Sequence, residues 1–75
     1  MDESDLTEEI NHQEALLKIQ RRNLRALQVQ IAQHGPFDVP LHMQTARDDL
    51  VAEIARLERA TRGLRARLRR AQRRR

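Results

Sequence analysis

The chain has 75 residues, of which 35% are charged and only one, Phe37, is aromatic. A chain of this size and polarity cannot enclose a sizeable core, so these values favour an elongated helical structure over a compact globule. The absence of cysteine excludes disulfides and thiolate metal sites, and no stretch reaches the roughly 20 apolar residues of a membrane span, so we expect a cytoplasmic protein.

The first predicted element is a helix over residues 5–34, which follows a disordered N-terminus at residues 1–4. Asp5 and Glu8 fit a capping pair at the start of this helix. Its apolar residues recur in alternating four- and three-residue steps, and two glutamines, Gln13 and Gln20, take the remaining positions of the same stripe. The apolar members of this stripe are Leu6, Ile10, Leu17, Leu24, Leu27 and Ile31.

A turn is predicted over residues 35–40, the one place where glycine and proline cluster and the location of both prolines. Gly35 suits a left-handed position at the end of the first helix. Phe37 or Val39 is expected to fold back over the helix ends as an apolar plug. Asp38 is expected to cap the start of the second helix.

The second predicted helix covers residues 41–71 and is followed by a basic tail at residues 72–75. It carries the same four-three rhythm, with Arg47 and Thr61 at its two polar positions. The other members of this second stripe are Met43, Leu50, Ile54, Leu57, Leu64, Leu68 and Ala71.

The two stripes match each other when the chain folds back at Phe37, because residues whose numbers add up to 74 then meet. Leu17 meets Leu57, and Gln13 falls in one layer with Thr61. This alternating pairing is what an antiparallel coiled coil requires. The sequence therefore predicts an all-α fold, an antiparallel two-helix coiled-coil hairpin that assembles further into a four-helix bundle.

A second, weaker apolar stripe lies beside the seam between the helices. Two interpretations remain open: it fills a broad apolar face of the hairpin itself, or it is the surface on which another hairpin or domain docks. In the second case the intermolecular face consists of Leu16, Ile19, Val29, Val51 and Ala55, with Ala26 beside them.

The residues offer no catalytic grouping. His34 and His42 flank the turn and His12 is distant, and two histidines without a third ligand make a poor zinc site. The sequence contains no glycine-rich phosphate loop and no nucleophile beside a base, and adjacent acids such as Glu8 and Glu9 read as helix-surface charge. We therefore expect neither an enzyme nor a bound cofactor or metal.

Charge is distributed unevenly along the chain. Six acids precede Lys18, the first base, whereas nine arginines and no acid lie between Arg59 and Arg75. Three interpretations are open for this basic end: pairing with the acidic end of the partner helix, non-specific binding of nucleic acid, or contact with an anionic membrane surface. The candidate contacts for an anion or nucleic acid are Arg59, Arg62, Arg65, Arg69, Arg70 and Arg73.

Residues 14–60 resemble a known module. The residues that carry the resemblance are the start Arg21-Arg22-Asn23-Leu24, the turn from Gly35 to Val39-Pro40, and the return through Ile54 to Leu57. They are similar to the small helical hairpins next to effector or signalling domains in bacterial multidomain proteins, including STAND/NACHT NTPases, TIR domains, caspase-like peptidases and CHAT peptidases. The resemblance implies adaptor or oligomerisation work rather than catalysis.

We therefore expect a protein–protein interaction module that forms a homo-oligomer, or docks on a related hairpin or an adjacent effector domain, and so clusters an attached effector or signalling domain. The alternative is a basic coiled-coil protein that binds nucleic acid non-specifically through its arginine-rich end. The two expectations differ in their salt dependence, because binding to phosphates weakens steeply as salt rises.

Overall fold

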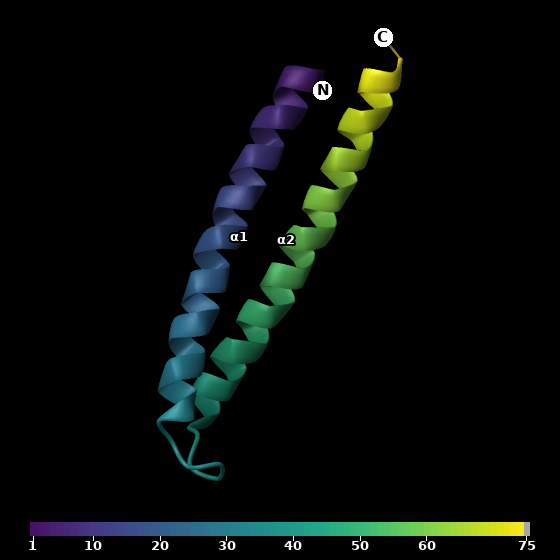
Figure 1. Ribbon diagram of the computed structural model, residues 1–75. Coiled ribbons are helices and arrows are strands. Elements are labelled where there is room, and N and C mark those ends of the chain that lie inside the picture. Colours follow the sequence, from purple (N-terminus) through teal and green to yellow (C-terminus); the bar gives the residue numbers. More distant parts are fainter. Residues whose placement is uncertain (75) are drawn as a thin grey trace.

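The computed structural model describes residues 1–74, which form two long helices, α1 (Glu3–Ala32) and α2 (Leu41–Arg73). The helices run antiparallel, so both termini lie at one end of the molecule and the connecting loop lies at the other (Figure 1). The Cα atoms span 57 × 14 × 14 Å, which is the shape of a thin rod. The predicted all-α hairpin is confirmed.

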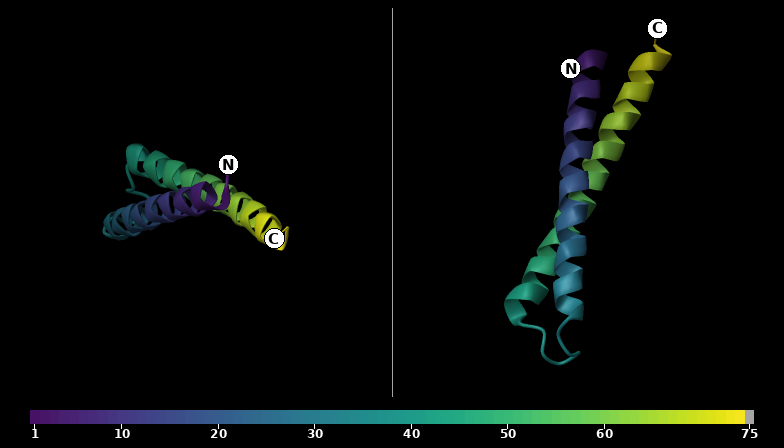
Figure 2. Two further views of the ribbon diagram at one scale, coloured as in Figure 1. Left: turned by 90° about the horizontal axis from the view of Figure 1, so that it is seen from above. Right: turned by 60° about the vertical axis from the view of Figure 1, so that its left-hand side comes forward.

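The two helices cross each other along their length rather than lying flat side by side (Figure 2). This crossing follows from the four-three rhythm of the apolar residues. The rhythm averages 3.5 residues per turn, slightly fewer than the 3.6 of a straight helix, so two such helices must wind around each other to keep their stripes in contact.

Every predicted seam residue is buried or half-buried. The fully buried apolar residues extend from Leu6 near the open end to the middle of the hairpin, where Leu17, Ile54 and Leu57 form one cluster and Leu57 is only 2% exposed. Leu16 and Leu24 pack partly buried against this cluster. The contact between residues 17 and 57 is the one that a fold at residue 37 requires.

The polar pair Gln13 and Thr61 lies within the seam but does not form the shared layer of hydrogen bonds that such a pair can make. The Thr61 hydroxyl is buried and donates to the Leu57 carbonyl of its own helix at 2.8 Å. Gln13 Nε2 donates to Glu9 Oε1 at 2.9 Å, and the buried Oε1 of Gln13 has no hydrogen-bond partner within residues 1–74. Each residue therefore bonds within its own helix.

Helix α1 begins two residues earlier than predicted because a different pair of acids caps it. The Asp5 backbone N–H donates to Asp2 Oδ1 at 2.9 Å, and the Asp2 backbone N–H donates to the Asp5 carboxylate. This reciprocal pair satisfies N–H groups that a helix start leaves open. The predicted pair of Asp5 and Glu8 was wrong, and Glu3 and Ser4 belong to the helix.

The loop also differs from the predicted turn. Gly35 does not adopt a left-handed conformation; instead, a Cβ at this position would lie 2.9 Å from the Asp38 carboxylate, so the glycine provides space. Asp38 does not cap α2, whose N-cap residue is Pro40 and has no side-chain cap. The Gln44 side chain instead donates to the Val39 carbonyl at 3.0 Å.

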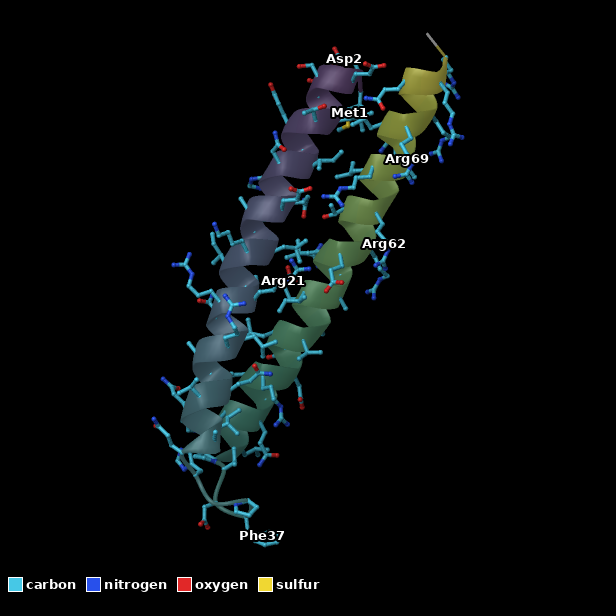
Figure 3. All side chains as sticks on the ribbon, viewed as in Figure 1. Met1, Asp2, Arg21, Phe37, Arg62 and Arg69 are labelled. Carbon is cyan, nitrogen blue, oxygen red and sulfur yellow. The ribbon has the colours of Figure 1, made fainter. Side chains whose placement is uncertain are left out.

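Phe37 is not an apolar plug. Its side chain is 98% exposed and extends from the tip of the loop (Figure 3), whereas Val39 is half-buried. At the other end of the molecule, α2 continues to Arg73, so residues 72 and 73 of the predicted basic tail are helical. Arg75 lies outside the described residues.

Candidate functional site

The hairpin has two flanks, one on each side of the seam. An α-helix advances 100° per residue, so the residue before a seam residue and the residue after it lie on opposite sides of the seam. On α1, for example, Leu16 precedes the seam residue Leu17 and Lys18 follows it. Each flank is therefore a separate surface with its own chemistry.

Two ion pairs between the helices show which sides belong together. Arg21 pairs with Glu58 at 3.8 Å, and Glu14 pairs with Arg65. All four residues directly follow a seam residue of their own helix. Residues that follow a seam residue on α1 and on α2 therefore share one flank, and residues that precede one share the other.

The first surface, here called the basic flank, carries bases from both helices. They lie three or four residues apart along each helix, and all of them except Arg69 line a groove between α1 and α2, which Leu17 and Thr61 also line. The bases of this flank are Lys18, Arg21 and Arg25 of α1 and Arg62, Arg65 and Arg69 of α2. Arg21 lies between the two helices in Figure 3, and Arg62 and Arg69 lie along α2.

Ion pairs neutralise only part of the basic flank. Glu14 and Glu58 pair with Arg65 and Arg21, the two bases nearest to the seam. Within residues 1–74, the other four bases of this flank form no ion pair: Lys18, Arg25, Arg62 and Arg69. The groove therefore keeps an excess of positive charge that the hairpin itself does not neutralise.

The acidic start of the chain lies at the same end of the rod as the arginines but faces other directions. Asp5 and Glu9 precede seam residues and so lie on the opposite flank, and Glu8 lies on the back of α1. None of these three forms an ion pair within the described residues. Pairing of the basic end with the acidic end, one of the three open interpretations, therefore occurs within residues 1–74 between Glu14 and Arg65 but not at Asp5, Glu8 or Glu9.

The second surface, here called the Leu16 flank, carries no charged residue of α1 in its central part. The α1 residues there are Leu16, which is half-buried, Ile19, which is 45% exposed, the exposed Asn23 and the small Ala26. Helix α2 adds Asp49, Glu53 and Arg56 to this central part, and then the small residues Ala60 and Gly63. Such small residues allow another helix to approach closely.

One ion pair on the Leu16 flank is internal to α2. Arg56 donates hydrogen bonds to both carboxylate oxygens of Glu53, with Nε at 2.9 Å from Oε2. These bonds lower the pKa of the Glu53 carboxyl and raise the pKa of Arg56. The two charges cancel, so they add no net charge to this flank.

The five residues of the predicted intermolecular face do not form one surface. Leu16 and Ile19 lie on the Leu16 flank, whereas Val51 and Ala55 follow Leu50 and Ile54 and so lie on the basic flank. Val29 is two residues from the nearest seam positions on either side, so it lies on the back of α1 and is 60% exposed. The prediction grouped these residues because all of them are apolar and lie outside the seam, and it did not distinguish the two sides of the seam.

The predicted anion contacts are divided in the same way. Arg62, Arg65 and Arg69 lie on the basic flank, Arg70 lies on the Leu16 flank, and Arg59 and Arg73 lie on the back of α2. Sequence reasoning missed Lys18, Arg21 and Arg25, which complete the basic flank from α1. Their position directly after seam residues could have identified them, because the α2 bases have the same relation to their own seam.

The histidines and the helix composition define the remaining chemistry. His12, His34 and His42 are all exposed, and within residues 1–74 no group of three or more His, Asp or Glu side chains is arranged to hold a metal ion. Neither α1 nor α2, as far as the structure describes them, contains an apolar stretch long enough to cross a membrane.

Comparison with known proteins adds no relative. No protein-family model matches the chain, and no curated protein or solved structure matches it. The assignment of function therefore rests on the geometry and chemistry of the two flanks.

Proposed function

We propose that this hairpin is a non-catalytic protein–protein interaction module that pairs with a second copy of itself through the Leu16 flank. The observation that carries the proposal is the thinness of the fold. Only five apolar side chains are buried among the described residues: Leu6, Ile10, Leu17, Ile54 and Leu57.

The accessible surface shows how incomplete this packing is. The chain exposes 5697 Å², whereas a compact monomer of 8.8 kDa exposes about 4,800 Å². The excess of about 900 Å² is close to the roughly 800 Å² that each partner contributes to a standard protein–protein interface. Pairing of two hairpins would therefore bring the protein to ordinary compactness.

The Leu16 flank suits this pairing better than the basic flank. Two basic flanks would repel each other, because each keeps unpaired Lys18, Arg25 and Arg62. Two Leu16 flanks instead offer Ile19 and part of Leu16 to be covered, and burial of apolar surface contributes about 25 cal/mol per Å². A pair of hairpins packed in this way is a four-helix bundle, which encloses a core.

Self-pairing would give the module a role in a larger protein. A rod with both chain termini at one end can hold an attached effector or signalling domain there, and pairing of two rods then brings two such domains together. The resemblance of residues 14–60 to hairpins beside bacterial effector domains supports this role. The partner is accordingly a second copy or a related hairpin.

The mass of the isolated chain in solution tests the proposal. Light scattering after nuclease treatment should show a mass that rises from 8.8 kDa toward twice that value as the concentration increases to about 100 µM. Nuclease treatment removes any apparent association that bound nucleic acid would cause. A mass that stays at 8.8 kDa over this range would contradict self-pairing.

A further inference from the structure

The basic flank faces away from the surface that the proposed pairing would cover. We propose that it binds the phosphate backbone of a nucleic acid duplex, with bases from both helices lying along the groove. This inference does not depend on self-pairing, because the two flanks lie on opposite sides of the seam.

The bases form a continuous line rather than a terminal cluster. The ion pair between Glu14 and Arg65 shows which residues of the two antiparallel helices lie at the same level. Arg69, four residues after Arg65, is therefore level with Ile10, four residues before Glu14. The line of bases from Arg25 to the level of Ile10 is therefore about 22 Å long, at a rise of 1.5 Å per residue. A duplex presents one phosphate per 3.4 Å on each strand, so this length spans about six phosphates of one strand.

The kind of base fits phosphate. Five of the six bases on this flank are arginines, whose planar guanidinium groups can donate two hydrogen bonds to phosphate oxygens. Four of the six bases have no ion pair within the described residues, so their charge is available to a ligand. Each base that replaces a counterion at a phosphate contributes to binding and to its salt dependence.

The position of the acids also favours an external anion. Apart from Glu14, the residues of the first four turns of α1 that lie on this flank are neutral: Ser4, Thr7 and Asn11. Asp5, Glu8 and Glu9 face the opposite flank or the back, where they do not oppose an anion in the groove. The three acids that do lie on this flank, Glu14, Asp48 and Glu58, each form an ion pair with an arginine.

The lack of aromatic side chains selects a duplex over a single strand. Proteins that bind single strands stack the bases on aromatic rings in addition to contacting the backbone. The one aromatic residue, Phe37, lies at the loop tip, beyond the end of the basic flank (Figure 3). Backbone contacts alone predict binding without sequence preference.

Binding of a fluorescent 20-base-pair DNA duplex, measured by anisotropy at several salt concentrations, tests the inference. Four available bases predict a slope of log K against log salt of about −3.6, which is roughly a 150-fold loss of affinity between 50 and 200 mM salt. The triple variant Lys18→Gln, Arg25→Gln and Arg62→Gln should reduce the slope to about −1. Circular dichroism should show unchanged helix content, because all three side chains are exposed.

A matched control removes the same charge from the back of the helices. Arg22, Arg59 and Arg73 each lie two residues from the nearest seam positions, and their replacement by Gln should leave the slope within about 1 of the wild-type value. Equal losses in both triple variants would overturn the inference, because net charge rather than the groove would then control binding.

A second variant should strengthen binding instead of weakening it. Glu14→Gln with Glu58→Gln releases Arg65 and Arg21 from their ion pairs, so two further bases become available and the slope should steepen by up to about 1.8. Tighter binding of the single strand than of the duplex would contradict the proposed ligand, as would equal binding of polyglutamate or of phosphatidylserine vesicles.

Discussion

Glu14 and Arg65 form an ion pair although 51 residues separate them in the sequence. Together with the pair between Arg21 and Glu58, it places equivalent positions of the two helices on one side of the seam. Exposed ion pairs of this kind stabilise a fold by only about 0.2–1 kcal/mol. These ion pairs are informative because they establish the register of the two helices, and that register defines which residues form each flank.

The register can be tested by a disulfide between the two helices. Gln13→Cys together with Thr61→Cys should form a disulfide within one chain under mild oxidation, because these positions share a seam layer in the hairpin. Gln13→Cys with Arg59→Cys is the matched control, since residue 59 lies on the back of α2 and should not form an intramolecular disulfide. Gel mobility after oxidation, at low protein concentration, distinguishes the two variants. Intermolecular products alone from the first variant would rule out the hairpin register.

The depth of burial along the seam predicts graded effects of core substitutions. Leu57→Ala should reduce the free energy of unfolding by about 2–4 kcal/mol, because Leu57 is 2% exposed and its removal leaves a cavity. Leu24→Ala should cost less, since Leu24 is half-buried. Val29→Ala, on the exposed back of α1, should change stability by no more than about 0.5 kcal/mol. Chemical denaturation followed by circular dichroism measures all three, and a reversed order would show that the seam is wrongly assigned.

The buried oxygen of Gln13 predicts a substitution that stabilises the hairpin. Its Oε1 has no hydrogen-bond partner, and an unsatisfied buried polar group costs about 1–3 kcal/mol. Gln13→Leu should therefore raise the free energy of unfolding by about 1 kcal/mol, although it also removes the hydrogen bond from Gln13 to Glu9. Glu9→Gln is the control, because it keeps a hydrogen-bond acceptor at the exposed end of that bond. A loss of stability in Gln13→Leu would indicate that the glutamine is satisfied in solution.

The ion pair between Glu53 and Arg56 predicts a dependence of stability on pH. Hydrogen bonds from Arg56 lower the pKa of Glu53 in the folded chain. The ionised carboxylate therefore stabilises the fold at pH values above its unfolded pKa of about 4.3, and this contribution is lost as the pH falls through the lower folded pKa. Thermal unfolding of wild type and Glu53→Gln should differ slightly at pH 7 and converge near pH 2. A difference that grows on acidification would contradict this assignment.

Much of the fold could be predicted from the sequence because one physical pattern dominates it. The four-three rhythm defines both seams, and the match between Leu17 and Leu57 follows from the position of the turn. The loop was harder to predict, because its conformation depends on short-range sterics. Gly35 accommodates the Asp38 carboxylate instead of adopting a left-handed conformation, and Phe37 is almost fully exposed.

The candidate surfaces could be predicted only in part. The apolar residues beside the seam and the arginines of α2 were evident as residue types. Their division into flanks depends on whether each residue precedes or follows a seam residue of its own helix. The ion pairs of Arg21 with Glu58 and of Glu14 with Arg65 show which of these positions on α1 and α2 share a side. Lys18 and Arg25 were overlooked because they are far in sequence from the arginine-rich end that they adjoin in space.

The proposed separation of functions, with pairing on the Leu16 flank and nucleic acid binding on the basic flank, is tested most directly by a pair of matched variants. Ile19 on the Leu16 flank and Val51 on the basic flank have similar exposure, 45% and 50%, and both can be replaced by Glu with the same change in charge. Sedimentation equilibrium at about 100 µM should show Ile19→Glu as an 8.8 kDa monomer, while wild type and Val51→Glu remain assembled at about twice that mass. If both variants stay assembled, or if only Val51→Glu dissociates, the Leu16 flank is not the surface through which the hairpins pair.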